Sequence, residues 1–417
     1  MEPHIDTGIT AWMLVSASLV LLMTPGLALF YGGMTRSKSV LNMMMMCFGA
    51  LALVAVIYPL WGWSMSYGDS LGGIVGNPLD QFGLGGSFDP VSVLDPETGA
   101  ALPTIVDVGF QTTFAIITVA LIAGAVADRV KFSTWMVFAA LWVTLSYFPM
   151  AHMVWSGGLL SGDGPFAAIA EPVDFAGGTV VHINAGVAGL VLALIVGRRT
   201  GFGTEPMRPH NLPLVMLGAA LLWFGWFGFN AGSAYGADET AGLAWANTTT
   251  AAAAAVLGWL TTEKLKYGRA TSLGAASGVV AGLVAITPAA GALTPVTSIV
   301  LGVLAGVLCA LAVGLKHTLG YDDSLDVVGV HLIGGLVGTV GIGFLATDTG
   351  LLLGGGVNLL LVQVIIAVIA VIFSGVVTLV IGLALKALMG WRVATEDEVR
   401  GIDVAEHAEG AYEGINS

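Results

Sequence analysis

The sequence predicts an all-α, polytopic membrane protein with eleven transmembrane helices, an N-terminus outside and a C-terminus inside. Of its 417 residues, 56% are hydrophobic and only 10% are charged, whereas soluble domains carry about 25% charged residues. The mean hydropathy is +0.89. The fourteen Lys and Arg residues gather in short clusters that long apolar intervals separate.

Each interval between basic clusters has room for two membrane helices. The intervals hold 90, 66, 55, 46 and 69 residues without Lys or Arg, and one span needs about 20. A first span, about 9–31, precedes Arg36. Because Lys and Arg favour cytoplasmic loops, one span plus five pairs gives eleven. The shortest interval fits spans at Ser272 to Thr287 and Thr297 to Leu315, around a turn at Pro288 to Pro295.

These spans define one transmembrane domain, 1–390, and a cytoplasmic tail, 391–417. Spans 1–5 fall within about 9–197, spans 6–10 within about 212–346, and span 11 at about 356–385. No long soluble segment is left for a separate enzyme domain. Both cysteines lie in apolar runs, which excludes a disulfide framework. The net charge of −13 argues against a nucleic-acid partner.

The acidic residues are distributed unevenly across the predicted membrane. Fourteen carboxylates face outward with no Lys or Arg among them, while the inner side is nearly neutral. An outer face of one sign concentrates cations within about a Debye length, although most surface acids are simply solvated loop residues. The fourteen are Glu2, Asp6, Asp69, Asp80, Asp89, Asp95, Glu97, Asp107, Asp163, Glu171, Asp174, Asp238, Glu239 and Asp348.

Two segments of the chain repeat one pattern. His182 to Val191 and His331 to Val340 both fit His-x-x-[Ala/Gly]-Gly-[Leu/Val]-[Ala/Val]-Gly-x-Val. They fall in spans five and ten, which cross the membrane in opposite senses. This pattern is typical of an inverted 5+5 repeat with its binding site near the midplane, and span eleven is then an addition.

The repeat places His182 and His331 at matching positions in the apolar interior. A lone buried histidine is usually a satisfied core residue, but ionisable groups inside a membrane tend to line a pathway. Because burial disfavours a second positive charge, two adjacent imidazoles hold at most one proton. They can share a hydrogen bond and exchange a proton with a passing weak acid. A metal site is the competing hypothesis, yet no third interior ligand is evident.

Aromatic residues near the outer ends of spans three, four and six complete a possible cation site. Phe114, Trp155 and Phe229 hold these positions. A cation over the face of Trp155 gains about 0.5–2 kcal/mol. An interfacial aromatic belt is the alternative explanation.

Several segments resemble the ammonium transporter family (Amt/MEP, related to Rh proteins). They span nearly the whole chain in the expected order. They are Pro25 to Gly33, Asp174 to Gly186, Phe229 to Ser233, Gly274 to Gly278, and Asp322 to Asp326 followed by Gly329 to His331.

The resemblance implies roles for individual residues on the outer side. Trp155, Phe114 and Ser233 match positions that bind ammonium in an outer vestibule, and Asp174 matches a carboxylate beneath it. Phe114 and Phe229 match a stacked gate. The segment 157–173 is longer than the family pattern, which predicts a different vestibule rim.

The resemblance also implies the deeper path and the assembly. His182 and His331 match the twin histidines of the conduction path, and Tyr31 and Trp226 match aromatics that line it. It further implies a homotrimer with a pore in each protomer, located in the plasma (inner) membrane. The tail resembles one that docks PII-type nitrogen regulatory proteins. No cofactor and no metal are expected.

The expected activity follows from the energetics of charge in an apolar medium. A bare ammonium ion in hydrocarbon costs tens of kcal/mol, in the Born picture, whereas neutral ammonia costs little. We therefore expect ammonium to bind outside, lose its proton near the gate or the histidines, and cross as ammonia. Alternatives are an ammonium sensor with little flux and a membrane enzyme with a histidine-based metal site.

Overall fold

The computed structural model describes residues 2–412. Within them, ten helical segments are long and apolar enough to cross a membrane. Two of these segments are interrupted by a π-helical turn in mid-span, and two begin with one. The ten segments are α1 (Thr7–Met34), α2 and α3 (Val40–Ile57, Trp63–Tyr67), α4 (Thr104–Ala123), α5 and α6 (Phe132–Trp142, Phe148–Trp155), α7 (Asn184–Val196), α8 (Leu212–Asn230), α10 (Ser272–Ile286), α11 (Pro295–Ala312), α13 (Ile333–Leu345) and α14 (Asn358–Leu388).

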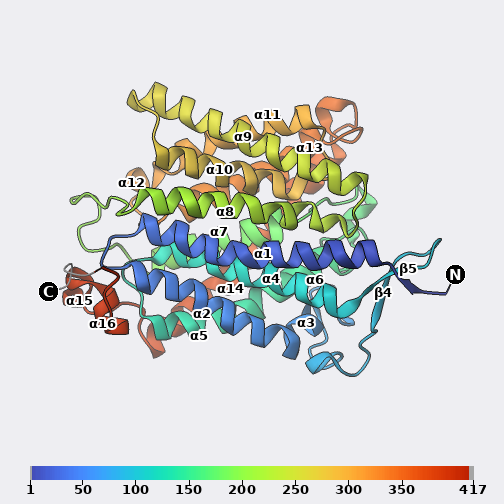
Figure 1. The fold of residues 1–417 in the computed structure, drawn as a ribbon, viewed down its shortest axis with the longest axis horizontal. Helices are drawn as coiled ribbons and strands as arrows, with labels where there is room; N and C mark the ends of the chain where they lie inside the picture. The colour runs from blue at the N-terminus through green and yellow to red at the C-terminus, as the bar shows by residue number, and fades with distance from the viewer. Residues whose placement is uncertain (1, 413–417) are drawn as a thin grey trace.

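One further long helix, α9 (Glu239–Tyr267), is less apolar because alanine and threonine dominate it. The side chain of Asp238 caps its first turn by accepting the Ala241 N–H at 2.9 Å. Helix α9 lies along α10 and α11 (Figure 1). A Cβ on Gly302 or Gly306 of α11 would come within 2.3 or 2.1 Å of a backbone oxygen of α9. Small residues therefore let these two helices approach closely, as in membrane helix pairs.

The long helices run roughly along the longest axis of the molecule (Figure 1). Helix α1 packs against α8, α4 and α2, while α14 packs against α7 and α5. The two ends of the described chain lie at opposite ends of this axis (Figure 1). We call them the sheet end, which holds the N-terminal strand, and the tail end, which holds the last helices.

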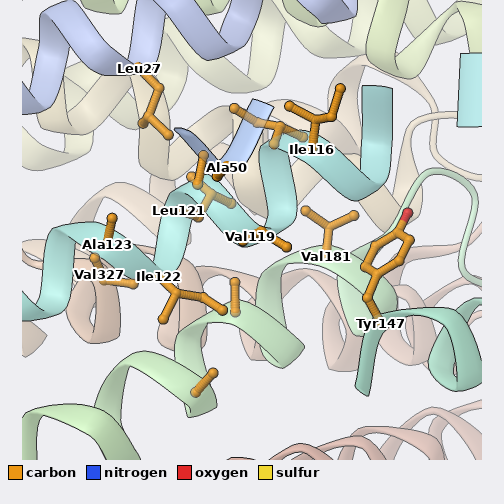
Figure 2. Packing of buried hydrophobic residues seen from close by; sticks show 14 of the residues in the cluster. Leu27, Ala50, Ile116, Val119, Leu121, Ile122, Ala123, Tyr147, Val181 and Val327 are labelled. Atoms are coloured by element: carbon orange, nitrogen blue, oxygen red, sulfur yellow. The ribbon is translucent and has the colours of Figure 1, made fainter. Parts of the chain in front are cut away.

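Helix α4 lies at the centre of the apolar core. Its side chains, including Ile116, Val119 and Leu121, are almost fully buried. Figure 2 shows them packed between Leu27 of α1 on one side and Val181 on the other. The helices that border the candidate site are thus held together by one continuous apolar cluster.

The sheet end carries two small β-structures. A three-stranded sheet has the order β1 (His4–Ile5), β5 (Ala100–Pro103), β4 (Val91–Asp95), with β1 parallel and β4 antiparallel to β5. A second pair joins β2 (Ser70–Leu71) to β3 (Val75–Gly76). The sheet brings the N-terminal segment against the hairpin that precedes α4.

The tail end is closed by two short helices, α15 (Thr395–Arg400) and α16 (Ile402–His407). Asp403 accepts the backbone N–H groups of Leu41 and Asn42 at 3.0 and 2.8 Å, where α2 begins. Glu406 accepts the N–H of Phe132, the first residue of α5, at 2.8 Å. The tail carboxylates therefore bind the otherwise unpaired N–H groups of two membrane helices. Residues 413–417 of the predicted tail lie outside the described residues.

Candidate functional site

The three residues predicted to bind a cation line one cavity at the sheet end. Phe114 of α4, Trp155 at the end of α6, and Ser233 in the turn after α8 share a space of about 370 Å³. Leu94 of β4 also lines it. We call this space the first cavity. Three elements distant in the sequence thus supply the predicted site.

Hydrogen bonds fix the polar atoms of this group. The Trp155 indole N–H donates to the Asp174 carbonyl at 2.9 Å, and the Ser233 hydroxyl donates to the Phe229 carbonyl at 2.8 Å. Trp155 meets Phe114 edge-on, with 6.1 Å between ring centroids. Since the Ser233 proton is already donated, its oxygen lone pairs are left to accept an N–H donor.

A stacked phenylalanine pair closes the first cavity toward the interior. The rings of Phe114 and Phe229 lie 4.1 Å apart at 21°, and each residue is 1% exposed. Phe114 faces the first cavity, whereas Phe229 lines the next one. A molecule that passes must therefore displace these rings.

Behind the pair lies a second cavity of about 10 Å³, room for one water-sized molecule. Its polar lining consists of His182, His331 and the ring of Trp226. The remaining lining residues are apolar: Met23, Leu27, Ile117, Leu121, Val181, Leu222, Phe229 and Val280. Such a space favours a neutral molecule over an ion.

The two histidines face each other across this cavity. Their Nδ1 atoms are 3.3 Å apart, and the ring planes differ by 22°. One Nδ1 must donate and the other accept, so at most one of them carries the shared proton. Trp226 stacks on His182 at 5.6 Å. The buried Nε2 atom of His182 has no hydrogen-bond partner among the described residues.

Each histidine lies on a π-helical turn, which the sequence did not predict. Gly178–Ile183 precedes α7 and carries His182, and Val328–Leu332 precedes α13 and carries His331. π-Helical turns inside helices are frequent at functional sites, because they shift side chains relative to a regular helix.

Matching glycines bring the two turns into contact. A Cβ on Gly186 would lie 2.4 Å from the backbone nitrogen of Leu332. A Cβ on Gly335 would lie 3.1 Å from that of Ile183. Gly186 follows His182 by four residues and lies against Leu332, the residue after His331. Gly335 follows His331 by four residues and lies against Ile183, the residue after His182. The contacts are therefore reciprocal.

Two aspartates cap these turns, each eight residues before its histidine. Asp174 accepts the N–H groups of Gly177, Gly178 and Thr179 at 2.8, 2.6 and 2.8 Å, and also the Thr179 hydroxyl. Asp323 accepts those of Val327 and Val328 at 3.1 and 2.7 Å. The sequence indicated Asp174 as a carboxylate beneath the vestibule. The Asp174 carboxylate oxygens accept backbone N–H groups of the turn, and the Asp174 backbone carbonyl accepts the Trp155 indole N–H.

The charge of these aspartates is influenced by their surroundings. Burial raises the pKa of Asp174, and its hydrogen bonds from Thr179 and the glycine N–H groups oppose that rise. Burial raises the pKa of Asp323 to about 6, against the lowering effect of the nearby Lys316 ammonium.

A third cavity of about 10 Å³ continues toward the tail end. His331 and Val280 line both the second and the third cavity, and Tyr31 and Asp326 line the third. The Tyr31 hydroxyl donates to the Leu121 carbonyl at 3.0 Å. The three cavities thus follow one another from the sheet end toward the tail end, and every residue predicted for the path except Asp174 lines one of them.

Sequence reasoning missed part of the first cavity. Asp107 and Gln111 line it beside Phe114, and Phe110 packs edge-on against Phe114 at 4.8 Å. Positions 107, 110, 111 and 114 share one face of a helix, since they are three and four residues apart. This helical spacing could have indicated that Asp107 and Gln111 lie beside Phe114. In the described part of the chain, no three His, Cys, Asp or Glu side chains gather as metal ligands.

Comparison with known proteins assigns the family. The sequence model of the Ammonium Transporter Family matches residues 11–412. The chain belongs to the ammonium transporter family. The ammonium transporter of Mycobacterium bovis is 54% identical over 98% of this chain and 91% of its own length. That of Aquifex aeolicus is 49% identical over 99% of this chain and 95% of its own length.

Solved structures of this family share the fold. Saccharomyces cerevisiae Mep2 superimposes with a TM-score of 0.83, at 32% identity, over 94% of this chain and 88% of its own. A structure described as a Sensor Amt Protein has a TM-score of 0.85, at 30% identity, over 96% of this chain and 98% of its own. With the ten candidate spans, these findings confirm a helical multi-pass membrane protein of a transporter family, not an enzyme family.

Proposed function

We propose that this protein takes up ammonium at the first cavity and passes it as ammonia through the second and third cavities. The observation that carries this proposal is the contact of His182 with His331, 3.3 Å apart between Nδ1 atoms, inside an otherwise apolar cavity. A pair of imidazoles there can accept and return a proton, while the surrounding side chains exclude a free ion.

Ammonium recruitment depends on groups of the first cavity. The ring faces of Trp155 and Phe114 attract a cation, and the Ser233 oxygen accepts one of its N–H groups. Asp174 supports cation access through its negative charge, and its backbone carbonyl positions Trp155 by accepting the indole N–H. Phe114 and Phe229 form the gate below this site.

Proton removal accounts for selectivity. Ammonium can leave its proton near the gate or at the histidine pair and continue as ammonia, which costs little to place among aliphatic side chains. Potassium is a similar-sized cation without a proton to give, so it stops at the gate. Tyr31 and Trp226 line the rest of the path.

The topology of this proposal has eleven spans in an inverted 5+5 repeat plus one helix. In this proposal helix α9, 29 residues long, is the seventh span in chain order and brings the total to eleven, and α14 is the helix outside the repeat. The reciprocal contacts of Gly186 and Gly335 support the repeat. The sheet end faces outside and the tail end inside, because basic side chains such as Lys38, Lys131 and Arg392 contact the tail segment or its neighbours.

We extend the proposal to assembly and regulation. Residues 1–390 form the transmembrane domain of a homotrimer with one path in each protomer, embedded in the plasma (inner) membrane. The segment 391–417 is a cytoplasmic tail. The tail end is then the face that a PII-type nitrogen regulatory protein docks on.

Proteoliposomes containing the full chain test the transport path. We expect ammonium-dependent transport by the wild type and its loss in H182A, with H4A, at an exposed histidine of the sheet end, as the matched control. A current on addition of ammonium, absent with potassium, identifies electrogenic transport, and flux without current identifies an ammonia channel. Equal flux through H182A and the wild type would exclude the proposed role of the pair.

A second candidate function, an ammonium sensor with little flux, is favoured by the similarity to the Sensor Amt Protein. Methylammonium uptake in cells that lack their own ammonium transporters distinguishes the two. Uptake well above that of cells with an empty vector supports transport, and binding without uptake supports the sensor.

A further inference from the structure

The first cavity contains a carboxylate that the proposed path does not use. Asp107, in the first turn of α4, lines this cavity together with Tyr67, Gln111 and Tyr235. Among the residues that line it in the described chain, Asp107 is the only one with a charged side chain. Of the fourteen acids predicted for the outer face, it is therefore the one placed to act on a cation inside the cavity.

A chain of two hydrogen bonds fixes one oxygen of this carboxylate through Tyr235, which Gln111 positions in turn. The Tyr235 hydroxyl donates to Asp107 Oδ1 at 2.7 Å, and the Gln111 amide donates to the Tyr235 oxygen at 2.7 Å. No hydrogen bond from the described residues reaches Asp107 Oδ2. One carboxylate oxygen is thus fixed, and the other is available to a ligand.

The backbone at Tyr235 is unusual and serves this arrangement. Its φ of 58° and ψ of 14° are left-handed, a conformation uncommon for a bulky side chain. The ring packs edge-on against Phe110 at 5.8 Å. The conformation directs the ring between α4 and the turn after α8, where its hydroxyl meets Asp107.

A second acceptor lies in the same cavity. The Tyr67 hydroxyl is buried and has no hydrogen-bond partner among the described residues. Its oxygen can accept an N–H group, as can Asp107 Oδ2. The cavity of about 370 Å³ far exceeds the roughly 30 Å³ that a water molecule occupies in the liquid. It can therefore hold one small cation beside Trp155 and another beside Asp107.

We propose that Asp107, positioned by Tyr235 and Gln111 and assisted by the Tyr67 hydroxyl, forms a second cation-binding site for ammonium and small alkylammonium ions ahead of Trp155. This inference rests on the proposed function, because it assigns a collecting step to the same cavity. A carboxylate inside a cleft with low-dielectric walls raises the local concentration of cations. The site thus increases occupancy of the Trp155 site and leaves the later steps unchanged.

Methylammonium uptake by the full chain in proteoliposomes tests this site, with KM measured at low and high salt. D107N is expected to raise KM about fivefold at low salt, the effect of one unit charge about 4 Å away in water, with the maximal rate unchanged. At about 1 M salt, where the Debye length is about 3 Å, the difference should fall below about twofold. D107E should keep the wild-type KM.

Y235F tests the positioning of Asp107, and E97Q is the matched control. Y235F keeps the ring but removes the donor to Asp107, and it should raise KM by an intermediate factor. E97Q, at an exposed acid of the β4–β5 hairpin that is not among the residues lining the cavity, should leave KM unchanged.

Specific results would overturn the second site. They are an unchanged KM in D107N at low salt, an equal rise in D107E, or a rise that persists at high salt. If D107N does not insert into membranes, an unchanged KM in Y235F overturns it. Absent uptake by the wild type would instead overturn the proposed function, so the two failures are distinguishable.

Discussion

Ring contacts connect the first and second cavities without a break. Trp155 meets Phe114, Phe114 stacks on Phe229, and Phe229 lies 6.3 Å from His182. Because protein interiors are closely packed, the position of each ring depends on its neighbours. We therefore expect a substitution at one ring to change both the affinity proposed for the first cavity and the closure of the proposed gate.

Removing the Trp155 ring tests the cation site directly. A cation over an indole face gains about 0.5–2 kcal/mol, so W155L should raise the KM for methylammonium between about 2-fold and 30-fold. Uptake kinetics in proteoliposomes provide the measurement. W245L is the matched control, since Trp245 lies half-exposed on α9 and stacks on Phe227 instead. Equal effects of both variants would contradict a specific role for Trp155.

Asp323 predicts a pH dependence of stability. Its pKa is about 6 in the folded protein and about 4 in an unfolded chain. The Asp323 carboxyl group therefore binds its proton more tightly in the folded protein than in the unfolded chain. Its contribution to the free energy of unfolding is complete below about pH 4 and is lost as the pH rises through 6. D323N should therefore destabilise the protein more at pH 5 than at pH 7.5. Thermal unfolding in detergent measures this difference, and equal shifts at both pH values would contradict it.

Most residues that line the three cavities at the predicted positions could be found from the sequence, whereas the residues that position them could not. His182 and His331 stood out because ionisable side chains are rare in apolar runs and these two repeat one pattern. Tyr235 gave no such signal, since its left-handed backbone and its bond to Asp107 depend on elements more than 100 residues apart. Long-range contacts of this kind cannot be derived from one sequence.

At the scale of elements, the π-helical turns explain how the two histidines meet. Each turn is capped by an aspartate and followed by a glycine that lets the other turn approach. The repeat of histidine and glycine was visible in the sequence. The π-helical geometry was not, because one extra residue per turn leaves no compositional trace.

Glycine substitutions test this contact in a graded way. In G186A the new Cβ would lie 2.4 Å from backbone of the other turn, whereas in G335A the closest atoms are 3.1 Å away. Backbone atoms cannot move aside as the end of a flexible side chain can. G186A should therefore lower the free energy of unfolding by about 1–3 kcal/mol, and it should also lower methylammonium uptake. G335A should do less. G242A on α9, where no atom lies within 4 Å, is the control and should be neutral; a loss there equal to that of G186A would contradict the argument.

We expect the carboxylates of Asp403 and Glu406 to hold the tail helices α15 and α16 against the first turns of α2 and α5. Replacing an N-cap acceptor by alanine typically costs about 1 kcal/mol, so D403A and E406A should each weaken docking of the tail on α2 and α5. Limited proteolysis by trypsin at the exposed Arg400 measures this as faster cleavage. E409A removes an exposed carboxylate of the same tail and should leave the cleavage rate unchanged. Cleavage as slow in D403A as in the wild type would show that the caps do not hold the tail.

At the scale of the whole molecule, the intervals between basic residues predicted eleven spans, whereas ten segments of the described chain are long and apolar enough to cross a membrane. The interval between Arg208 and Lys264 required two helices, and α8 and α9 occupy it. The sheet of β1, β4 and β5 was not predicted, because its strands are two to five residues long. Such short strands carry no periodicity, and their pairing depends on the fold around them.

We expect helix α9 to cross the membrane although it is rich in threonine. The hydroxyls of Thr248 and Thr250 donate to the Ala244 and Ala246 carbonyls at 2.6 and 3.0 Å, so these polar groups are satisfied within the helix. At about 1.5 Å per residue, its 29 residues reach about 43 Å, more than the roughly 30 Å hydrocarbon core.

Single cysteines at the two ends of α9 should therefore react from opposite sides of the membrane. Cys47 and Cys309 are buried, which keeps the background low in intact cells. A237C, at an exposed position before α9, should react with an impermeant maleimide added outside. R269C, exposed just after the helix, should react only once the membrane is permeabilised. Labelling of both from the same side would place α9 along the surface, and the chain would then have ten spans with both termini on one side.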